Sequence, residues 1–291
     1  MNQIYFPQIT IVGPGLLGSS LGLAARERRL CEHIVGVGRN KASLDEALHV
    51  EGVDTTTMDL EGGLAEADLV VLCMPICTIV KMLPQIMAAC KAGALVTDVG
   101  STKCSIVKTG EQFSKPDGGQ FVGCHPMAGS EKFGARFARA DLYNNTTCYV
   151  TKTETTDLKA FARVSALWRA LGTRLVVMRP ERHDTLTAMV SHLPHMISVS
   201  MMKAMELSGE DKNLVRGIIG NGFRDMTRVA AANTDMWVDI GCDNQSAVRE
   251  ALSLFRDALN DVVDVKGEIS KEKLRGLLED AAEYRDFLAT N

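Results

Sequence analysis

The chain has 291 residues, 46% of them hydrophobic and 23% charged, and its 32 basic and 36 acidic side chains give a net charge of −4. This composition is typical of an ordinary soluble globular protein, and the length suggests roughly two domains. No basic block is present, which argues against nucleic acid or an anionic membrane as a partner. The N-terminal stretch MNQIYFPQ shows no signal-peptide pattern, and the longest apolar run is broken by Pro75. We therefore expect a cytoplasmic protein.

The eight cysteines form no CxxC pair, and most lie inside apolar runs. This pattern favours small buried side chains in a reducing compartment over disulfides or metal ligands. Cys124, next to the histidine discussed below, is interpreted as a buried strand residue rather than a nucleophile.

Strand and helix patterns alternate through the first part of the chain. β-rich apolar runs occur at 8–13, 33–38, 67–75, 93–101, 119–126, 147–152 and 173–180, and helical patterns occur at 16–29, 43–52, 79–91 and 155–172. Such alternation predicts an α/β protein with a Rossmann-like, doubly wound, mostly parallel sheet. We assign residues 1–180 to this dinucleotide-binding domain.

The strand signal nearly disappears after residue 180. Val248, Leu252, Phe255, Leu259 and Val262 are spaced by four, three, four and three residues, which predicts an amphipathic helix, and 270–284 shows a second one. We therefore predict an all-helical domain over 181–291 that binds substrate and mediates dimerisation. Long amphipathic helices of this kind favour a homodimer.

A glycine-rich turn lies between the first strand and the first helix. Gly13, Gly15 and Gly18 form the pattern GxGxxG in ITIVGPGLLGSSLG. The first glycine permits a tight turn, the second lets the backbone approach a pyrophosphate, and the third allows close packing of the helix on the strand. In this strand–turn–helix context the pattern predicts a dinucleotide site with the anion at the helix N-terminus.

The end of the second strand bears on the choice of cofactor. NAD sites usually carry an acid there, whereas this chain has Gly38 followed by Arg39. A guanidinium suits a 2′-phosphate better than a diol, so NADP is favoured over NAD. Arg39 could instead stack on the adenine or remain solvated, and NAD would then bind as well.

His125 and Ser101 each follow a predicted strand, where ligands of an open α/β sheet bind. Pro126 restricts the backbone of His125 to extended angles. A neutral imidazole can accept the proton of a hydroxyl whose carbon gives up a hydride, and Ser101 could bond to the same hydroxyl or to the histidine. The alternative for His125 is a loop residue with a backbone hydrogen bond.

Further polar groups lie in the helical part. His192 and His195 are three residues apart and share a helix face, with His183 and Asp184 upstream. A zinc site would need further ligands in a suitable arrangement, and Pro194 interrupts the pair, so we predict no metal. The segment 221–237 places two arginines and Asp225 among apolar residues, and Arg228 could hold a substrate carboxylate in a bidentate fork. The alternative is an Arg–Asp pair on a solvated helix face.

These motifs together resemble the prephenate/arogenate dehydrogenase family of tyrosine biosynthesis. GPGLLGSSLG, ADLVVLCMP, TDVGSTK, HPMAGSE, HD followed by SHLPH, and GFRDMTR with a later MW occur in the family's order over nearly the whole chain. The resemblance implies NAD(P)-dependent oxidative decarboxylation of prephenate to 4-hydroxyphenylpyruvate, or of arogenate to tyrosine.

The resemblance also implies roles for individual residues. His125 would take the proton of the C4 hydroxyl, with Ser101 supporting it and the cofactor. Substrate would contact the residues Arg228, His195, His192, Glu131, Asp225 and Trp237. The cofactor would contact Gly13, Gly15, Leu16, Leu17, Gly18, Arg39, Pro75 and Ser101.

Two other interpretations remain open. A Rossmann-plus-helices oxidoreductase of the β-hydroxyacid type shares the layout, but it usually relies on a lysine or aspartate in the helical domain and has no need of HPMAGSE. A nicotinamide-sensing regulator would keep the glycine turn but would have no use for His125 together with Arg228. Reduction of cofactor on addition of prephenate separates an enzyme from a sensor.

Overall fold

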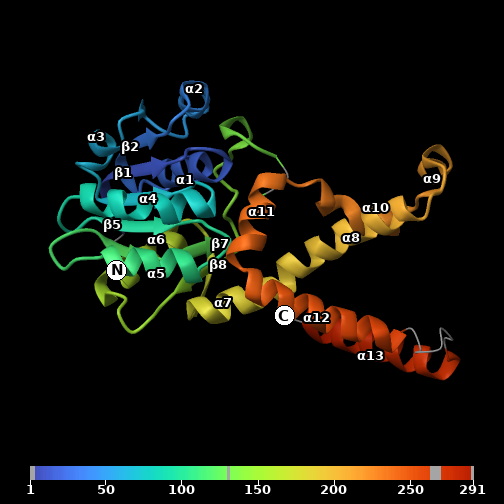
Figure 1. Cartoon of the computed structure of the whole chain (residues 1–291). Helices are drawn as coiled ribbons and strands as arrows, with labels where there is room; N and C mark the ends of the chain where they lie inside the picture. The colour runs from blue at the N-terminus through green and yellow to red at the C-terminus, as the bar shows by residue number, and fades with distance from the viewer. Residues whose placement is uncertain (1–3, 130–131, 263–269, 290–291) are drawn as a thin grey trace. The chain divides into compact units, whose positions relative to one another are not determined.

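The computed structural model describes residues 4–129, 132–262 and 270–289, which form two compact units, 1–245 and 246–291 (Figure 1). The first unit contains all the described strands, and the second contains two helices, α12 (Gln245–Val262, which begins at the boundary) and α13 (Lys271–Ala289). Within the described residues no helix is long and apolar enough to cross a membrane. The domain boundary that we predict at residue 180 stays a prediction.

A six-stranded parallel sheet forms the centre of the first unit, in the order β3-β2-β1-β4-β5-β6. Its strands are β1 (Phe6–Val12), β2 (Cys31–Val37), β3 (Thr55–Thr57), β4 (Leu69–Leu72), β5 (Leu95–Asp98) and β6 (Gln120–Val122). The strand order reverses between β1 and β4, the position at which doubly wound sheets bind dinucleotides. The predicted Rossmann-like fold is confirmed.

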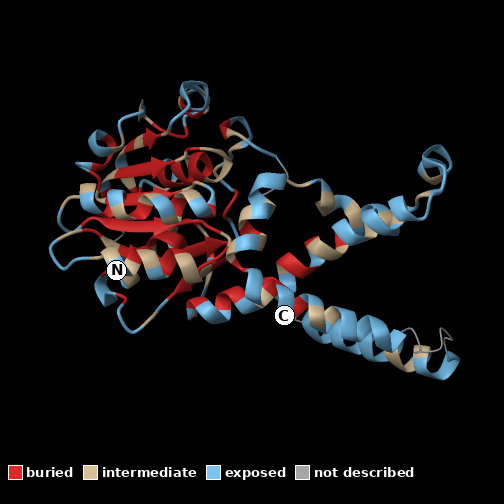
Figure 2. Ribbon diagram, viewed as in Figure 1, coloured by how far each residue is buried: buried red, intermediate tan, exposed pale blue. Residues whose placement is uncertain are grey.

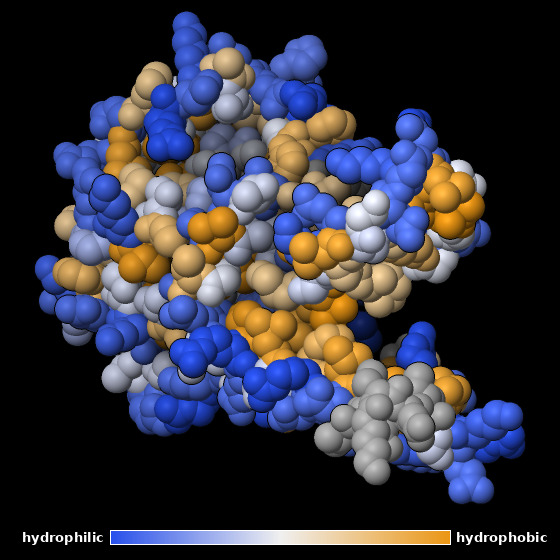
Figure 3. All heavy atoms as spheres, turned by 45° about the vertical axis from the view of Figure 1, so that its right-hand side comes forward, coloured by the Kyte–Doolittle hydropathy of each residue, from blue (hydrophilic) through white to orange (hydrophobic). Residues whose placement is uncertain are grey.

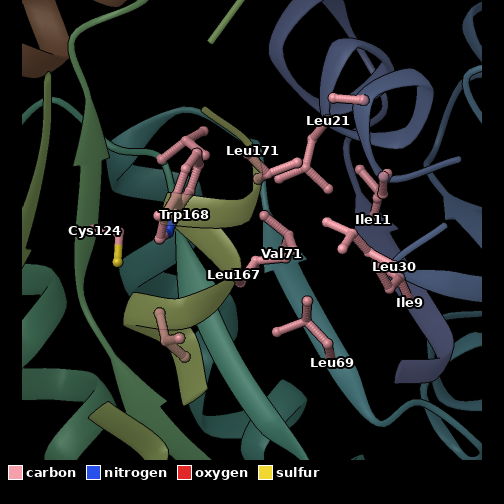
Figure 4. Close-up of a cluster of buried hydrophobic side chains, with 14 of the residues drawn as sticks. Ile9, Ile11, Leu21, Leu30, Leu69, Val71, Cys124, Leu167, Trp168 and Leu171 are labelled. Atoms are coloured by element: carbon pink, nitrogen blue, oxygen red, sulfur yellow. The ribbon is translucent and has the colours of Figure 1, made fainter. Parts of the chain in front are cut away.

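Helices pack on the sheet through apolar side chains. They are α1 (Leu16–Glu27), α2 (Lys41–His49), α3 (Leu60–Leu64), α4 (Ile76–Ala89), α5 (Cys104–Phe113) and α6 (Leu158–Ala170). One buried cluster joins β1 and α1 to the α6 residues Leu167 and Trp168 (Figure 4), and another joins the sheet to α4 and α5. The central strands β4 and β5 are therefore wholly buried and β1 nearly so, whereas the edge strand β3 and the outer faces of the helices are more exposed (Figure 2).

The apolar run 119–126 is divided between two sheets, which differs from the single strand that the sequence predicts. After β6 the chain turns at Gly123, and Cys124–Pro126 form β7 of a three-stranded sheet with β8 (Thr147–Thr151) and β9 (Arg174–Met178). A Cβ at Gly123 would lie 2.5 Å from Val107 Cγ2 and 2.6 Å from Thr151 Oγ1. Only glycine fits this corner, because helix and strand approach its backbone so closely.

The rest of the first unit is helical. Its elements are α7 (Pro180–Thr187), a π-helical turn (Ala188–His192), α8 (Leu193–Leu207), α9 (Lys212–Ile218), α10 (Asn221–Thr227), a 3₁₀ turn (Arg228–Ala231) and α11 (Thr234–Asp243). The predicted helical C-terminal part is thus confirmed. All eight cysteines are free thiols. Cys124 and Cys148 are buried as expected, four others are half-buried, and Cys77 and Cys242 are exposed, so the expectation of burial is wrong for these last two.

Candidate active site

The glycine-rich turn has the geometry expected of a dinucleotide site. Gly13 has φ of 85°, and a Cβ there would lie 2.9 Å from the carbonyl oxygen of Cys73. A Cβ at Gly18 would lie 2.7 Å from Ile11 Cγ2, so this glycine lets α1 pack directly on β1. The N–H of Gly13 donates to the carbonyl of Val37 at 2.8 Å and fixes the turn to the end of β2.

The N-terminus of α1 leaves room for an anion. Gly15 is the N-cap residue, no side chain caps the helix, and the first turn contains no acid. A Cβ built on Gly15 would meet nothing within 4 Å, in contrast to Gly13 and Gly18. The N–H groups of Leu16 and Leu17 begin the helix beside this space, which suits a pyrophosphate. These residues therefore fit a bound dinucleotide.

Three other predicted cofactor residues follow strand ends at the same edge of the sheet. Arg39 lies after β2 and is exposed, Pro75 is the N-cap of α4 after β4, and Ser101 lies between β5 and α5. Because the carboxyl ends of parallel strands meet at one edge, these residues lie along the same edge of the sheet as the glycine turn.

His125 is a buried residue of β7, with 7% of its surface exposed. The backbone next to it is anchored by Asp98, which accepts from the N–H of Cys124 at 3.0 Å. Its Nδ1 lies 2.9 Å from Nε2 of His183, on α7. Burial is the main reason why the pKa of His125 lies well below its usual value. The nearby His183, Lys103 and His192 lower it further. The imidazole is therefore neutral at pH 7, as a proton acceptor must be.

A buried ion pair supports this region and was not foreseen from the sequence. Lys103 and Asp98 have fully buried side chains, and Nζ of the lysine bonds to Oδ2 of the aspartate. Oδ2 also accepts from the N–H of Gly100 at 2.8 Å. A lysine between a buried strand and a helix, five residues after an aspartate, is the signal that could have indicated it.

His192, His195 and Trp237 form a ring cluster. The ring of His195 stacks on Trp237 with centroids 3.5 Å apart, and the ring of His192 meets Trp237 edge-on at 5.9 Å. Burial lowers the pKa of both histidines, that of His192 to about 4. Among the described residues, His195 Nδ1 and Trp237 Nε1 are buried without a hydrogen-bond partner, so a ligand could supply one.

Asn244 connects this ring cluster to the His125 region. Its side-chain amide donates to the carbonyl of Asp184 at 2.8 Å and lies 3.3 Å from His192 Nδ1. The adjacent Asp243 accepts from Thr102 and Ser105 at 2.6 and 2.8 Å, which fastens the end of α11 to the start of α5. His125 and His192 are therefore connected through the polar groups of His183, Asp184 and Asn244.

Arg228 and Asp225, two further substrate-binding predictions, have no hydrogen bond or ion pair to His125 within the described part of the chain. Arg228 begins the 3₁₀ turn that packs against α8, and Asp225 lies on α10; both side chains are exposed. Over 4–129, 132–262 and 270–289 no ion pair links either residue to another group, so the alternative of an Arg–Asp pair is not observed. Glu131 lies outside the described residues. In the same part of the chain no group of three or more His, Cys, Asp or Glu side chains is arranged to hold a metal.

Comparison with known proteins gives matches along nearly the whole chain. Residues 21–177 match the nucleotide-binding domain of prephenate dehydrogenase, and residues 179–280 match its dimerization domain. Prephenate dehydrogenase of Bacillus subtilis is 31% identical over 99% of this chain and 77% of that protein.

Two solved structures are similar in both fold and sequence. Prephenate dehydrogenase from A. aeolicus, in complex with hydroxyphenyl propionate and NAD⁺, has a TM-score of 0.89 at 28% identity, over 97% of this chain and 98% of that one. Synechocystis arogenate dehydrogenase has a TM-score of 0.81 at 30% identity, over 97% and 99% of the two chains.

Proposed function

Because this chain belongs to the prephenate dehydrogenase family, we propose that it converts prephenate to 4-hydroxyphenylpyruvate by oxidative decarboxylation, with a nicotinamide cofactor as hydride acceptor. One observation of the structure carries the proposal. A neutral, buried imidazole, that of His125, lies in β7, three residues beyond the last residue of β6 of the parallel sheet.

The reaction requires one proton acceptor and accurate alignment. A nicotinamide dinucleotide held by the glycine turn would supply the acceptor for the hydride that leaves C4 of the substrate. His125 accepts the proton of the C4 hydroxyl, so that C4 becomes a carbonyl carbon. The bond to the ring carboxylate then breaks, its electron pair enters the ring, and carbon dioxide leaves. The resulting phenolate recovers the proton from His125. Because the ring becomes aromatic, the protein mainly has to orient the reactants and exchange one proton.

For the cofactor we propose NADP rather than NAD as the preferred form. The support is Arg39, an exposed guanidinium at the end of β2, in the position where an acid would bind the ribose hydroxyls of NAD. Gly13, Gly15, Gly18, Leu16 and Leu17 would hold the pyrophosphate. Pro75 and Ser101 would contact the nicotinamide half.

For the substrate we propose that the dianion is held by Arg228 and the ring cluster. Arg228 offers an exposed guanidinium, and His195 and Trp237 offer buried polar atoms that lack partners among the described residues. Asp225, His192 and Glu131 would order the pocket around it. These assignments rest on the motifs together with the placement of the described residues.

We further propose that the chain acts as a homodimer. Apolar side chains reach the surface in several places (Figure 3), and those on helices α8 to α10 include Val199, Met202, Leu207, Leu214, Ile218 and Met226. Leu207 and Ile218 are 74% and 73% exposed, which is unfavourable for single chains in water. The matched dimerization domain covers this segment.

The alternative substrate is arogenate, which carries an ammonium group where prephenate has a keto group. An exposed carboxylate, Asp225, three residues before Arg228, favours it, because a carboxylate can pair with that ammonium. Initial rates with prephenate or arogenate, each with NAD⁺ or NADP⁺, test both proposals. We expect the highest kcat/KM for prephenate with NADP⁺. Turnover of neither substrate would contradict the proposed function.

The role of His125 is tested by His125→Asn. This variant should keep cofactor binding but lose most of kcat, since proton acceptance typically contributes 10²–10⁴-fold. A kcat close to that of the unchanged protein would refute the role.

A further inference from the structure

The ring of His125 is the first member of a buried chain of three side chains. Its Nδ1 lies 2.9 Å from Nε2 of His183, and Nδ1 of His183 lies 2.7 Å from Oδ1 of Asp184. The three residues are 7%, 0% and 4% exposed. The two imidazoles meet edge-to-face, with centroids 5.1 Å apart. This series of hydrogen-bonded side chains therefore begins at His125 on β7 and ends at the Asp184 carboxylate on α7.

Asp184 is held firmly by groups from two other elements. Its two oxygens accept from the backbone N–H groups of Lys103 and Cys104 at 2.7 and 2.8 Å, at the start of α5. Its backbone carbonyl accepts from the side-chain amide of Asn244. The hydroxyl of Thr187 donates to the carbonyl of His183 at 2.9 Å. The histidine–aspartate pair is thus fixed in position and orientation.

The hydrogen bonds determine where each proton lies. Burial alone would raise the pKa of Asp184, but hydrogen bonds from His183 and Cys104 outweigh it and lower the pKa, so the group is ionised. A carboxylate only accepts, so His183 must donate from Nδ1. Burial lowers the pKa of His183, which leaves its Nε2 as an acceptor. His125 must then donate from Nδ1 and carry its lone pair on Nε2.

We propose that His183 and Asp184 are positioning residues for the reaction: they fix the His125 tautomer whose Nε2 accepts the substrate proton, and they stabilise the imidazolium that forms. This inference rests on the proposed function of His125. In free neutral histidine the tautomer protonated at Nε2 also occurs, and it cannot accept at that atom. The same logic connects aspartate, histidine and nucleophile in serine hydrolases.

Other charged groups face the same region. The Lys103 ammonium is paired with the Asp98 carboxylate, and His192 lies on the far side of Asn244. Among the residues that the structure describes, the carboxylate bonded to the histidine pair is that of Asp184, so it is the group that can balance a positive charge arising on His125.

A matched pair of variants tests the proposal through kinetics. His183→Gln retains an amide oxygen close to the position of Nε2, so it can still accept from Nδ1 of His125. His183→Leu has no acceptor. We expect the leucine variant to lose about 10- to 100-fold in kcat, the range expected for a hydrogen bond to a charged group, with KM nearly unchanged. The glutamine variant should recover most of this loss. Equal losses in both would overturn the proposal and indicate a purely structural pair.

A second measurement needs no substrate and reads the tautomer in the unchanged protein; the variant His125→Asn serves only to assign the signals. In the unchanged protein labelled with ¹⁵N-histidine, the ring signals that disappear in His125→Asn identify His125. We expect its Nδ1 to be protonated and its Nε2 to have the shift of an unprotonated nitrogen at neutral pH. A proton on Nε2 instead would overturn the proposal. Because this result does not depend on turnover, it is distinguishable from a failure to oxidise prephenate or arogenate.

Discussion

Removing the negative charge of the buried Lys103–Asp98 pair should destabilise the protein strongly. In Asp98→Asn the Lys103 ammonium, which is fully buried, loses its counter-charge. Asp98 also accepts from the N–H groups of Gly100 and Cys124 at 2.8 and 3.0 Å, so the new amide NH₂ must face at least one other donor whichever way it turns. Breaking a buried ion pair from one side costs about 3–5 kcal/mol.

The assay is thermal unfolding followed by circular dichroism. At roughly 2–4 °C per kcal/mol, Asp98→Asn should lower Tm by about 10 °C. Adding Lys103→Met should restore at least about 2 kcal/mol, because the unpaired charge is then removed. The matched control is Glu206→Gln, which breaks an exposed pair with Lys203, 63% exposed on both sides, and should cost no more than about 0.5 kcal/mol. A Tm of Asp98→Asn within 2 °C of the control would refute the reasoning.

Three further predictions concern ionisable side chains of the proposed site. Arg39→Ala should weaken NADP⁺ binding about tenfold or more and NAD⁺ binding much less, as measured by titration. Lys41→Ala is the control variant and should not show this difference. Equal losses for both cofactors in Arg39→Ala would contradict the NADP preference. Arg228→Ala should raise KM with little change in kcat, whereas Arg224→Ala should not, and steady-state kinetics decide between them. His192 has a folded pKa of about 4 against about 6.5 unfolded, so below pH 6.5 protons bind the unfolded chain first. The lowered pKa of His192 should thus reduce the free energy of unfolding by about 3 kcal/mol between pH 6.5 and 4. In His192→Gln this contribution should be missing, and urea titrations of both proteins at the two pH values measure it.

The fold could be predicted well because its signals are local. The alternation of apolar runs and helical patterns predicts the doubly wound sheet, and the glycine spacing marks its first turn. The division at Gly123 could not be predicted in this way. Its causes are Val107 and Thr151, which lie 16 and 28 residues away along the chain, and no local pattern reports such a close approach.

For the candidate site, too, local sequence signals could be recognised, whereas contacts between residues distant along the chain could not. His125 could be singled out by its strand and its proline, but its partner His183 is 58 residues away. The adjacent His–Asp pair of α7 is visible in the sequence, which does not favour a metal site there, but no sequence pattern connects the pair to His125. Which nitrogen faces which oxygen depends on packing between α7, β7 and α5. The roles of Arg228, Asp225 and Glu131 stay predictions.

The turn at Gly123 separates two tasks that the reaction combines. The cofactor turn belongs to the six-stranded sheet, whereas His125 belongs to the three-stranded one, and a single residue without a side chain joins β6 to β7. Tyr149 of β8 lies beside the ring of His125, with centroids 6.1 Å apart, so a change in β8 can alter the surroundings of the imidazole without altering the strands of the parallel sheet. Over evolutionary time, one sheet can be conserved for a common coenzyme while the other adapts to a new ring alcohol.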